Sequence, residues 1–281
     1  MKWYPGLLHS FNLAEDLVYI VLGPRQVGKT TLFKLLVRKL LSESGVFPRC
    51  ILYLNCEELG SQTPQELSEH IESYINWVRT QSNHRLYVMM DEATYVKDWE
   101  RSVKIVADRG LLKGVTLIAT GSHAAGLRRG AERLPGRRGR GEDLDLALLP
   151  LSFREYLVAR KPELKDKLPQ FPGWGLNALF TAAQEVSLYR DSISPLFEVY
   201  FRTGGFPRSM RDEVSSGHVK QDVYKLYKDA FVGDLIRLGR RESLFRELAQ
   251  WIINHRSLFF DREKKILALP IEYLLALLAG H

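Results

Sequence analysis

The segment GPRQVGKTT, residues 23–31, restricts the possible fold of this chain more than any other part of the sequence. It fits the pattern G-x-x-x-x-G-K-[ST]. The apolar run DLVYIVLG, residues 16–23, comes before it and predicts a buried strand. The segment KTTLFKLLVRKLLSESG has leucines at helical spacing and predicts an amphipathic helix. The pattern therefore joins a strand to a helix, which is the context of a phosphate-binding loop and argues against a chance match.

The residue types in this loop suit a phosphate group. Glycine at 23 and 28 lets the backbone wrap phosphate oxygens where a side chain would collide, and the helix N-terminus favours an anion. We expect Lys29 to reach the β- and γ-phosphates of a nucleotide and Thr30 to ligate Mg²⁺. The residues expected to bind the nucleotide are Gly23, Pro24, Arg25, Gln26, Val27, Gly28, Lys29, Thr30 and Thr31.

Asp91 and Glu92 follow the apolar run RLYVMM, which predicts another buried strand. An aspartate at the tip of a strand can hold Mg²⁺, and a glutamate next to it can polarise an attacking water. The alternative is that the two carboxylates only begin the next loop. Together with a phosphate-binding loop, this Asp–Glu pair favours hydrolysis by water. It also places the chain in the class of P-loop ATPases in which a further strand lies between the two motif strands.

The segment GVTLIATGS predicts that further strand, with Thr120 and Ser122 at its tip. A small polar side chain at this position can hydrogen-bond the γ-phosphate or the attacking water, so both residues are candidates for a catalytic role. Ser122 could equally cap the next helix, and the two roles are compatible.

Strands and helices alternate through the first half of the chain. Further strands are expected in RCILYLNC and LDLALLPLS, and further helices over residues 98–107 and after Thr63, a suitable N-cap followed by Pro64. Strands joined by helical crossovers predict an α/β fold, a P-loop NTPase parallel sheet flanked by helices. From Phe153 onward the segments have helical patterns only.

Five segments occur in an order that resembles a known family: GPRQVGKTTL, DE with VKDWERSVKIVADRG, TLIATGSH, LPGRRG and LLPLSFREYL. They are similar to archaeal and bacterial AAA-type ATPases of the STAND-like branch, usually described only as ATP-binding proteins, over about residues 4–238. The resemblance implies an ATPase core at residues 1–150, a helical lid at 151–215 and a truncated winged-helix-like region at 216–281. It also implies ATP as the nucleotide, and no guanine-reading N/T-K-x-D motif is present.

The segment RTGGFPRSM, residues 202–210, resembles the glycine–proline signature of STAND-like lids. The resemblance implies that Pro207 approaches the bound nucleotide and reports its state to the next domain. The alternative is that the two glycines cap a helix and that Pro207 stops it.

An arginine-rich loop is expected over residues 127–146, after the strand that ends at Thr120. Arg137 and Arg138 lie in a glycine-flanked turn and are candidates to stabilise the phosphoryl transition state, from the same chain or from a neighbour. The loop could instead bind a nucleic-acid backbone or be a solvated surface. No aromatic residue stands among the arginines to stack on bases, and acidic residues dilute the charge.

The net charge of +7 permits anionic partners, whether nucleotide, nucleic acid or acidic protein, without choosing among them. No apolar run of about 18 residues occurs, so no membrane span is expected. The N-terminus has no secretory pattern and the two cysteines form no CxxC pair, which favours a cytoplasmic protein with free thiols. A complete winged helix needs a recognition helix and a β-hairpin, and too little chain follows His255 for both. We therefore expect the apolar segment at residues 271–278 to pack on the lid, a partner protein or a second copy.

These patterns predict an ATP-binding, Mg²⁺-dependent ATPase that couples its nucleotide state to movement of the helical C-terminal region. The alternative is a nucleotide-gated switch with very slow turnover that binds a partner protein or DNA. The adjacent pair Asp91–Glu92 favours turnover, because it supplies both a metal site and a general base.

Overall fold

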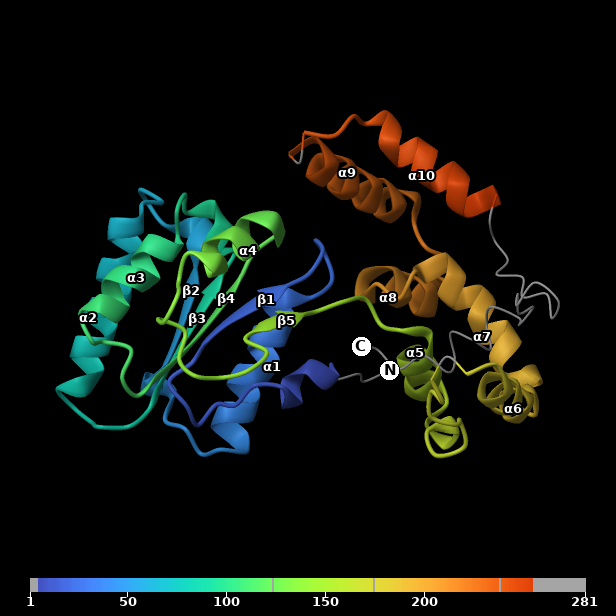
Figure 1. Cartoon of the computed structure of the whole chain (residues 1–281), viewed down its shortest axis with the longest axis horizontal. Helices are drawn as coiled ribbons and strands as arrows, with labels where there is room; N and C mark the ends of the chain where they lie inside the picture. Colours follow the sequence, from blue (N-terminus) through green and yellow to red (C-terminus); the bar gives the residue numbers. More distant parts are fainter. Residues whose placement is uncertain (1–4, 123, 174, 238, 255–281) are drawn as a thin grey trace. The chain divides into compact units, whose positions relative to one another are not determined.

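The computed structural model describes residues 5–122, 124–173, 175–237 and 239–254 of the 281-residue chain. The chain divides into two compact units, of which the first ends at Leu149 and the second begins at Pro150. Figure 1 shows the first unit as a sheet with helices around it and the second as helices. Each unit is described by itself.

The first unit is built on a five-stranded sheet in which every pair of neighbouring strands is parallel. The strands are β1 (Val18–Leu22), β2 (Ile51–Asn55), β3 (Leu86–Asp91), β4 (Val115–Thr120) and β5 (Asp145–Ala147), and their order is β2-β3-β4-β1-β5. This arrangement confirms the α/β P-loop fold. It also confirms that β4 lies between β1, which precedes the phosphate-binding loop, and β3, which carries Asp91 and Glu92.

Helices cover both faces of this sheet, as Figure 1 shows. They are α1 (Lys29–Ser42), α2 (Pro64–Arg79), α3 (Glu100–Asp108) and α4 (Ala124–Glu132), with short 3-10 helices at Gly6–His9, Pro48–Cys50, Cys56–Glu58 and Ala93–Tyr95. Phe33 of α1 belongs to the hydrophobic core on one face, whereas Ile71 of α2 and Val103 of α3 belong to the core on the other. Every residue of β3 and β4 is buried, which explains their continuous apolar pattern.

The helix α2 begins as the sequence predicts. Thr63 is its N-cap and accepts a hydrogen bond from the backbone N–H of Glu66 at 3.2 Å, and Pro64 is the first helical residue. A proline at this position has no N–H to leave unpaired, and its fixed φ suits the helix.

The arginine-rich segment is not a loop throughout. Its first residues, up to Glu132, belong to the helix α4, which follows Ser122 and extends further than the sequence interpretation expected. Leu127, Ala131 and Leu134 recur at spacings of four and three and are all buried in the core. This short apolar stripe was hidden among charged residues, and packing against the sheet decides in favour of the helix.

The second unit contains the helices α5 (Phe153–Arg160), α6 (Leu176–Ser187), α7 (Arg190–Thr203), α8 (Pro207–Ser216), α9 (Gln221–Arg237) and α10 (Ser243–Asn254), with a 3-10 helix at Pro162–Leu164. Its core includes Phe153, Tyr156, Leu157 and Ile193. Gly204 caps α7 in the left-handed region, but Pro207 does not stop a helix; it starts α8. The apolar segment at residues 271–278 lies outside the described residues.

Among the residues that the structure describes, no helix combines the length and the apolar character needed to cross a bilayer.

The core of the first unit gives a stability prediction. Replacing the fully buried Ile71 by alanine should lower the free energy of unfolding by about 2–5 kcal/mol, because it removes apolar contacts and leaves a cavity. Trp77 on the same helix is 53% exposed, so Trp77→Ala is the matched control and should change stability much less. Urea unfolding followed by circular dichroism measures both variants, and equal losses would contradict the assigned core.

Candidate functional site

The residues picked from the sequence motifs meet at the carboxyl edge of the sheet, where the strands β1, β3 and β4 end. The phosphate-binding loop connects β1 to α1 at this edge. Ligands of open α/β sheets bind outside the carboxyl ends of the strands, beside helix N-termini. The edge is therefore the candidate functional site.

The loop has the backbone that its glycines permit. A Cβ atom at Gly23 would collide with the carbonyl oxygen of Leu148, so only glycine fits there. Gly28, the N-cap of α1, has a φ of 104°, which side chains rarely allow. The two glycines thus let the loop pass close to β5 and turn into the helix.

Two cationic side chains of the loop fit an anionic ligand. Lys29 is 5% exposed, and its Nζ donates to the carbonyl oxygens of Gly23 at 3.0 Å and Pro24 at 3.1 Å. The Nε of Arg25 is buried and has no hydrogen-bond partner within the described part of the chain. A buried donor without a partner costs about 1–3 kcal/mol, which a bound phosphate oxygen would offset.

Asp91 is the centre of the hydrogen-bond network at this edge. Its Oδ2 accepts from the hydroxyls of Thr30 at 2.7 Å and Tyr53 at 2.8 Å. Its Oδ1 accepts from the hydroxyl of Thr120 at 2.6 Å and from the backbone N–H of Glu92 at 3.1 Å. The structure therefore brings together Thr30, Asp91 and Thr120, three residues that the sequence placed in one site from separate motifs.

Tyr53 is the member of this network that sequence reasoning missed. The register pairs Tyr53 of β2 with Met89 of β3, two residues before Asp91. Residues two apart on a strand share a face, so a long side chain at 53 reaches Asp91 diagonally. The available signal was a tyrosine among the apolar residues of the strand ILYLN.

Glu92 has an unusual backbone and a fully engaged carboxylate. Its φ is 52°, in the left-handed region, and its N–H also lies 3.3 Å from the hydroxyl of Thr120. Its side chain accepts hydrogen bonds from Ser122, from the backbone N–H at 2.8 Å and from the hydroxyl at 2.6 Å. Ser122 is thus directly coupled to the candidate general base.

The donor set fits Mg²⁺. The hydroxyl of Thr30 and the carboxylate of Asp91 are hard oxygen ligands that already contact each other. Among the residues that the structure describes, no group of three or more histidine, cysteine, aspartate or glutamate side chains could hold a metal ion. Proteins usually hold Mg²⁺ through one or two side chains together with the phosphates of a substrate, and the contact between Thr30 and Asp91 suits that mode.

Cys56 lies fully buried close to these carboxylates. Burial raises the pKa of Cys56 to about 12, and the negative charges of Asp91 and Glu92 contribute to the rise. The thiol therefore stays neutral near pH 7, so it is neither a nucleophile nor a metal ligand there.

Arg137 and Arg138 lie at the other end of the strands. Arg137 forms an ion pair with Asp108, the last residue of α3, at 2.6 Å. Arg138 donates to the carbonyl oxygen of Val18, the first residue of β1, at 3.1 Å. The phosphate-binding loop follows the opposite end of β1, about 15 Å away at the usual rise per residue. The structure does not bring either arginine to the phosphate-binding loop of its own chain.

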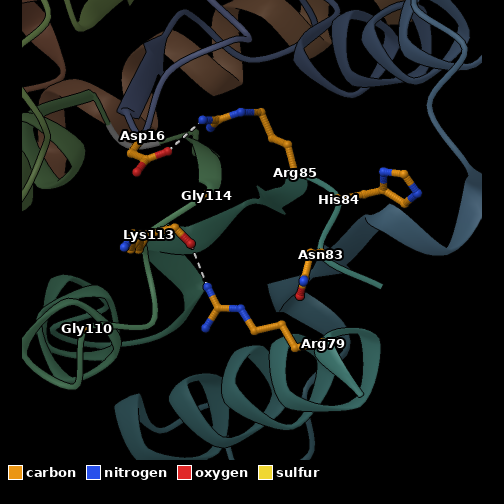
Figure 2. A pocket seen from close by; sticks show the side chains of 8 residues that line it. All are labelled: Asp16, Arg79, Asn83, His84, Arg85, Gly110, Lys113 and Gly114. Carbon is orange, nitrogen blue, oxygen red and sulfur yellow. Dashed lines mark hydrogen bonds and ion pairs between the residues drawn. The ribbon is translucent and has the colours of Figure 1, made fainter. Parts of the chain in front are cut away.

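A cavity of about 710 Å³ opens at this amino edge of the sheet (Figure 2). The close-up shows that two of its basic side chains are already engaged. Arg85 pairs with Asp16, and Arg79 donates to the carbonyl oxygen of Lys113; the first of these distances is 2.7 Å. Arg137 lines a neighbouring cavity that shares Asp16 and Lys113 with it. Both cavities lie away from the candidate site.

Pro207 belongs to the second unit, where it is the first residue of α8. Its contact with a nucleotide in the first unit stays a prediction.

Several solved structures resemble this chain at a distance. A Walker-type ATPase of Pyrococcus abyssi shares 16% identity at a TM-score of 0.42, covering 86% of this chain and 74% of that one. PCH-2 of C. elegans shares 16% identity at a TM-score of 0.40, covering 67% of this chain and 50% of that one. The ORC1 protein of Aeropyrum pernix, solved in complex with DNA, shares 14% identity at a TM-score of 0.38, covering 93% of this chain and 86% of that one.

No curated protein matches this chain. The family described as AAA domain matches residues 15–157, which is just over half of the chain and includes the whole network around Asp91. This protein is therefore a member of the AAA domain family, with the nucleotide-binding loop and the acidic strand tip of an AAA-type P-loop ATPase.

Proposed function

We propose that this protein hydrolyses ATP to ADP and phosphate at the carboxyl edge of its sheet. The observation that carries the proposal is the four-donor network on Asp91, which joins the helix after the phosphate-binding loop to the tips of β3 and β4. An ATPase needs the phosphate site, the metal ligands and the base within a few ångströms of one another, and this network supplies that proximity.

Each residue has a role in this proposal. Lys29 and Arg25 contact phosphate oxygens, and Thr30 with Asp91 holds Mg²⁺, which supplies positive charge to the phosphates when bound. Glu92 accepts a proton from water as the water oxygen bonds to the γ-phosphorus and the bond to the β–γ bridging oxygen breaks. Thr120 and Ser122 orient that water or the γ-phosphate.

A second candidate function is a nucleotide-gated switch with slow turnover. It is favoured by the bonds from Ser122 to Glu92, because a carboxylate that already accepts two hydrogen bonds is less free to take a proton from water. Turnover would then require Glu92 to leave Ser122, for example when a partner protein or DNA binds.

The helical second unit is the proposed output of the nucleotide state, in the manner of STAND-like proteins. Pro207 would contact the nucleotide, and the C-terminal helices would bind a partner protein or a second copy, with DNA as a weaker possibility. The two buried cysteines are free thiols, which suits a reducing compartment, and we propose the cytoplasm.

ATP binding predicts a shift in thermal stability. At 100 times its Kd, Mg²⁺ with ATP should add about 2.7 kcal/mol to the folded state and raise Tm by about 5 °C. Lys29→Ala should abolish this shift, because the charge next to the phosphates is lost. Lys34→Ala, which changes an exposed lysine on the same helix, is the control and should keep the shift. An unchanged thermal shift in Lys29→Ala would contradict the assignment of Lys29 to the phosphate site.

The rate of ATP turnover tests the role of Glu92 as general base. Glu92→Gln should keep the ATP-induced thermal shift and lower phosphate release by about 10²–10⁴-fold, the usual contribution of a general base. Glu69→Gln on the surface of α2 is the control. Ser122→Ala separates the two functions: faster release would show that Ser122 restrains Glu92 in a switch, and slower release would show that it assists hydrolysis. Wild-type release from Glu92→Gln would leave Glu92 without a catalytic role.

The two arginines give a third test. Because Arg137 and Arg138 do not reach the phosphate-binding loop of their own chain, the double substitution to alanine should leave turnover nearly unchanged in dilute, monomeric protein. A contact from a neighbouring chain would instead be worth about 10³-fold or more, and only at concentrations where chains associate. Turnover measured across protein concentration decides, with the exposed Arg140→Ala as control. A large loss in dilute monomer would contradict the observed placement.

A further inference from the structure

Tyr53 stands out at the candidate site because packing does not account for its hydroxyl group. Its ring lies edge-on to Phe33 of α1, with the centroids 6.2 Å apart, and a phenylalanine could make the same contact. The side chain is 42% exposed, so burial alone does not require this residue either. What the hydroxyl adds is the 2.8 Å hydrogen bond to Asp91 Oδ2.

The hydroxyl of Tyr53 is a dependable donor. A tyrosine hydroxyl carries its proton at neutral pH, so it can donate the hydrogen bond that Asp91 Oδ2 accepts. The backbone position of Tyr53 is also fixed, since the residue lies within β2 and pairs in register with β3.

The bond matters because of where it holds the carboxylate. Thr120, at the end of β4, binds Oδ1, and Tyr53, from β2 on the other side of β3, binds Oδ2. The carboxylate is thus fixed from both neighbouring strands. Without Tyr53, Oδ2 would keep only Thr30 among these donors, and Thr30 is itself a proposed metal ligand. The side chain of Asp91 could then rotate more freely about its terminal torsion.

We propose that Tyr53 is a positioning residue, which orients the carboxylate of Asp91 for Mg²⁺ and thereby sets the metal affinity of the nucleotide site. The inference rests on the proposed function, because it concerns the same metal site. Groups that hydrogen-bond a metal-binding carboxylate usually change metal affinity or activity by about 10–100-fold when they are removed.

Tyr53→Phe tests this role, since it removes the hydroxyl and keeps the ring. The Mg²⁺ concentration that gives half of the ATP-induced thermal stabilisation should rise about 10-fold. Mn²⁺ binding with ATP present, followed by electron paramagnetic resonance, should weaken by a similar factor. At saturating Mg²⁺ the rate of phosphate release should return close to that of the wild type, because Glu92 and the phosphate-binding loop are unchanged.

Tyr74→Phe is the matched control, because it also removes a tyrosine hydroxyl that donates one hydrogen bond, here to the carbonyl oxygen of Arg49 on the surface. It should leave the Mg²⁺ midpoint unchanged. A wild-type midpoint in Tyr53→Phe, or a loss of stability without any change in the midpoint, would overturn the proposal. Failure of the proposed function would be distinct: the wild-type protein itself would show no Mg²⁺-dependent response to ATP, and this inference would fall with it.

Discussion

The buried carboxylate of Asp91 is the constraint on which the rest of the site depends. Asp91 is only 2% exposed, and a charge removed from water is costly unless hydrogen bonds replace its hydration. Three of its four donors come from α1, β2 and β4, which are distant in the sequence, and the fourth is the adjoining peptide N–H. The carboxylate can therefore be buried at low cost only if these segments are correctly placed. The chemistry of the site and the arrangement of the sheet edge are stabilised by the same bonds.

The backbone after Asp91 is also unusual. Glu92 has a positive φ, a conformation that costs of order 1–3 kcal/mol when the residue is not glycine. The same conformation carries its carboxylate to Ser122 at the tip of the neighbouring β4. The candidate general base and the polar residue after β4 are thus linked by hydrogen bonds, which a movement of Glu92 away from Ser122 would break.

Most of the first unit could be predicted from the sequence because its strands are parallel and buried on both faces. Such strands appear as short apolar runs, and glycine, a capping threonine and a proline mark where the helices begin and end. The extent of the helix α4 was missed because few apolar residues stand among its charged ones, and their packing in the core is not visible in the sequence. Tyr53 was missed because its role depends on the register between β2 and β3, which a single strand does not reveal. The helix α8 was missed because a proline that begins a helix resembles one that ends it.

The arginines of the segment after α4 have a structural explanation in the first unit. Arg133 pairs with Glu100 at 2.7 Å, Arg137 with Asp108 at 2.6 Å, and Arg138 with Asp145 at 2.6 Å. Glu100 and Asp108 belong to α3 and Asp145 belongs to β5, so the charges hold a segment with few apolar residues between α3 and the sheet. Surface pairs of this kind contribute little to stability, but they favour one path for a loop over others. Since these positive charges are already satisfied by carboxylates, a nucleic-acid backbone would have to displace those partners first, and the gain from binding it here would be correspondingly small.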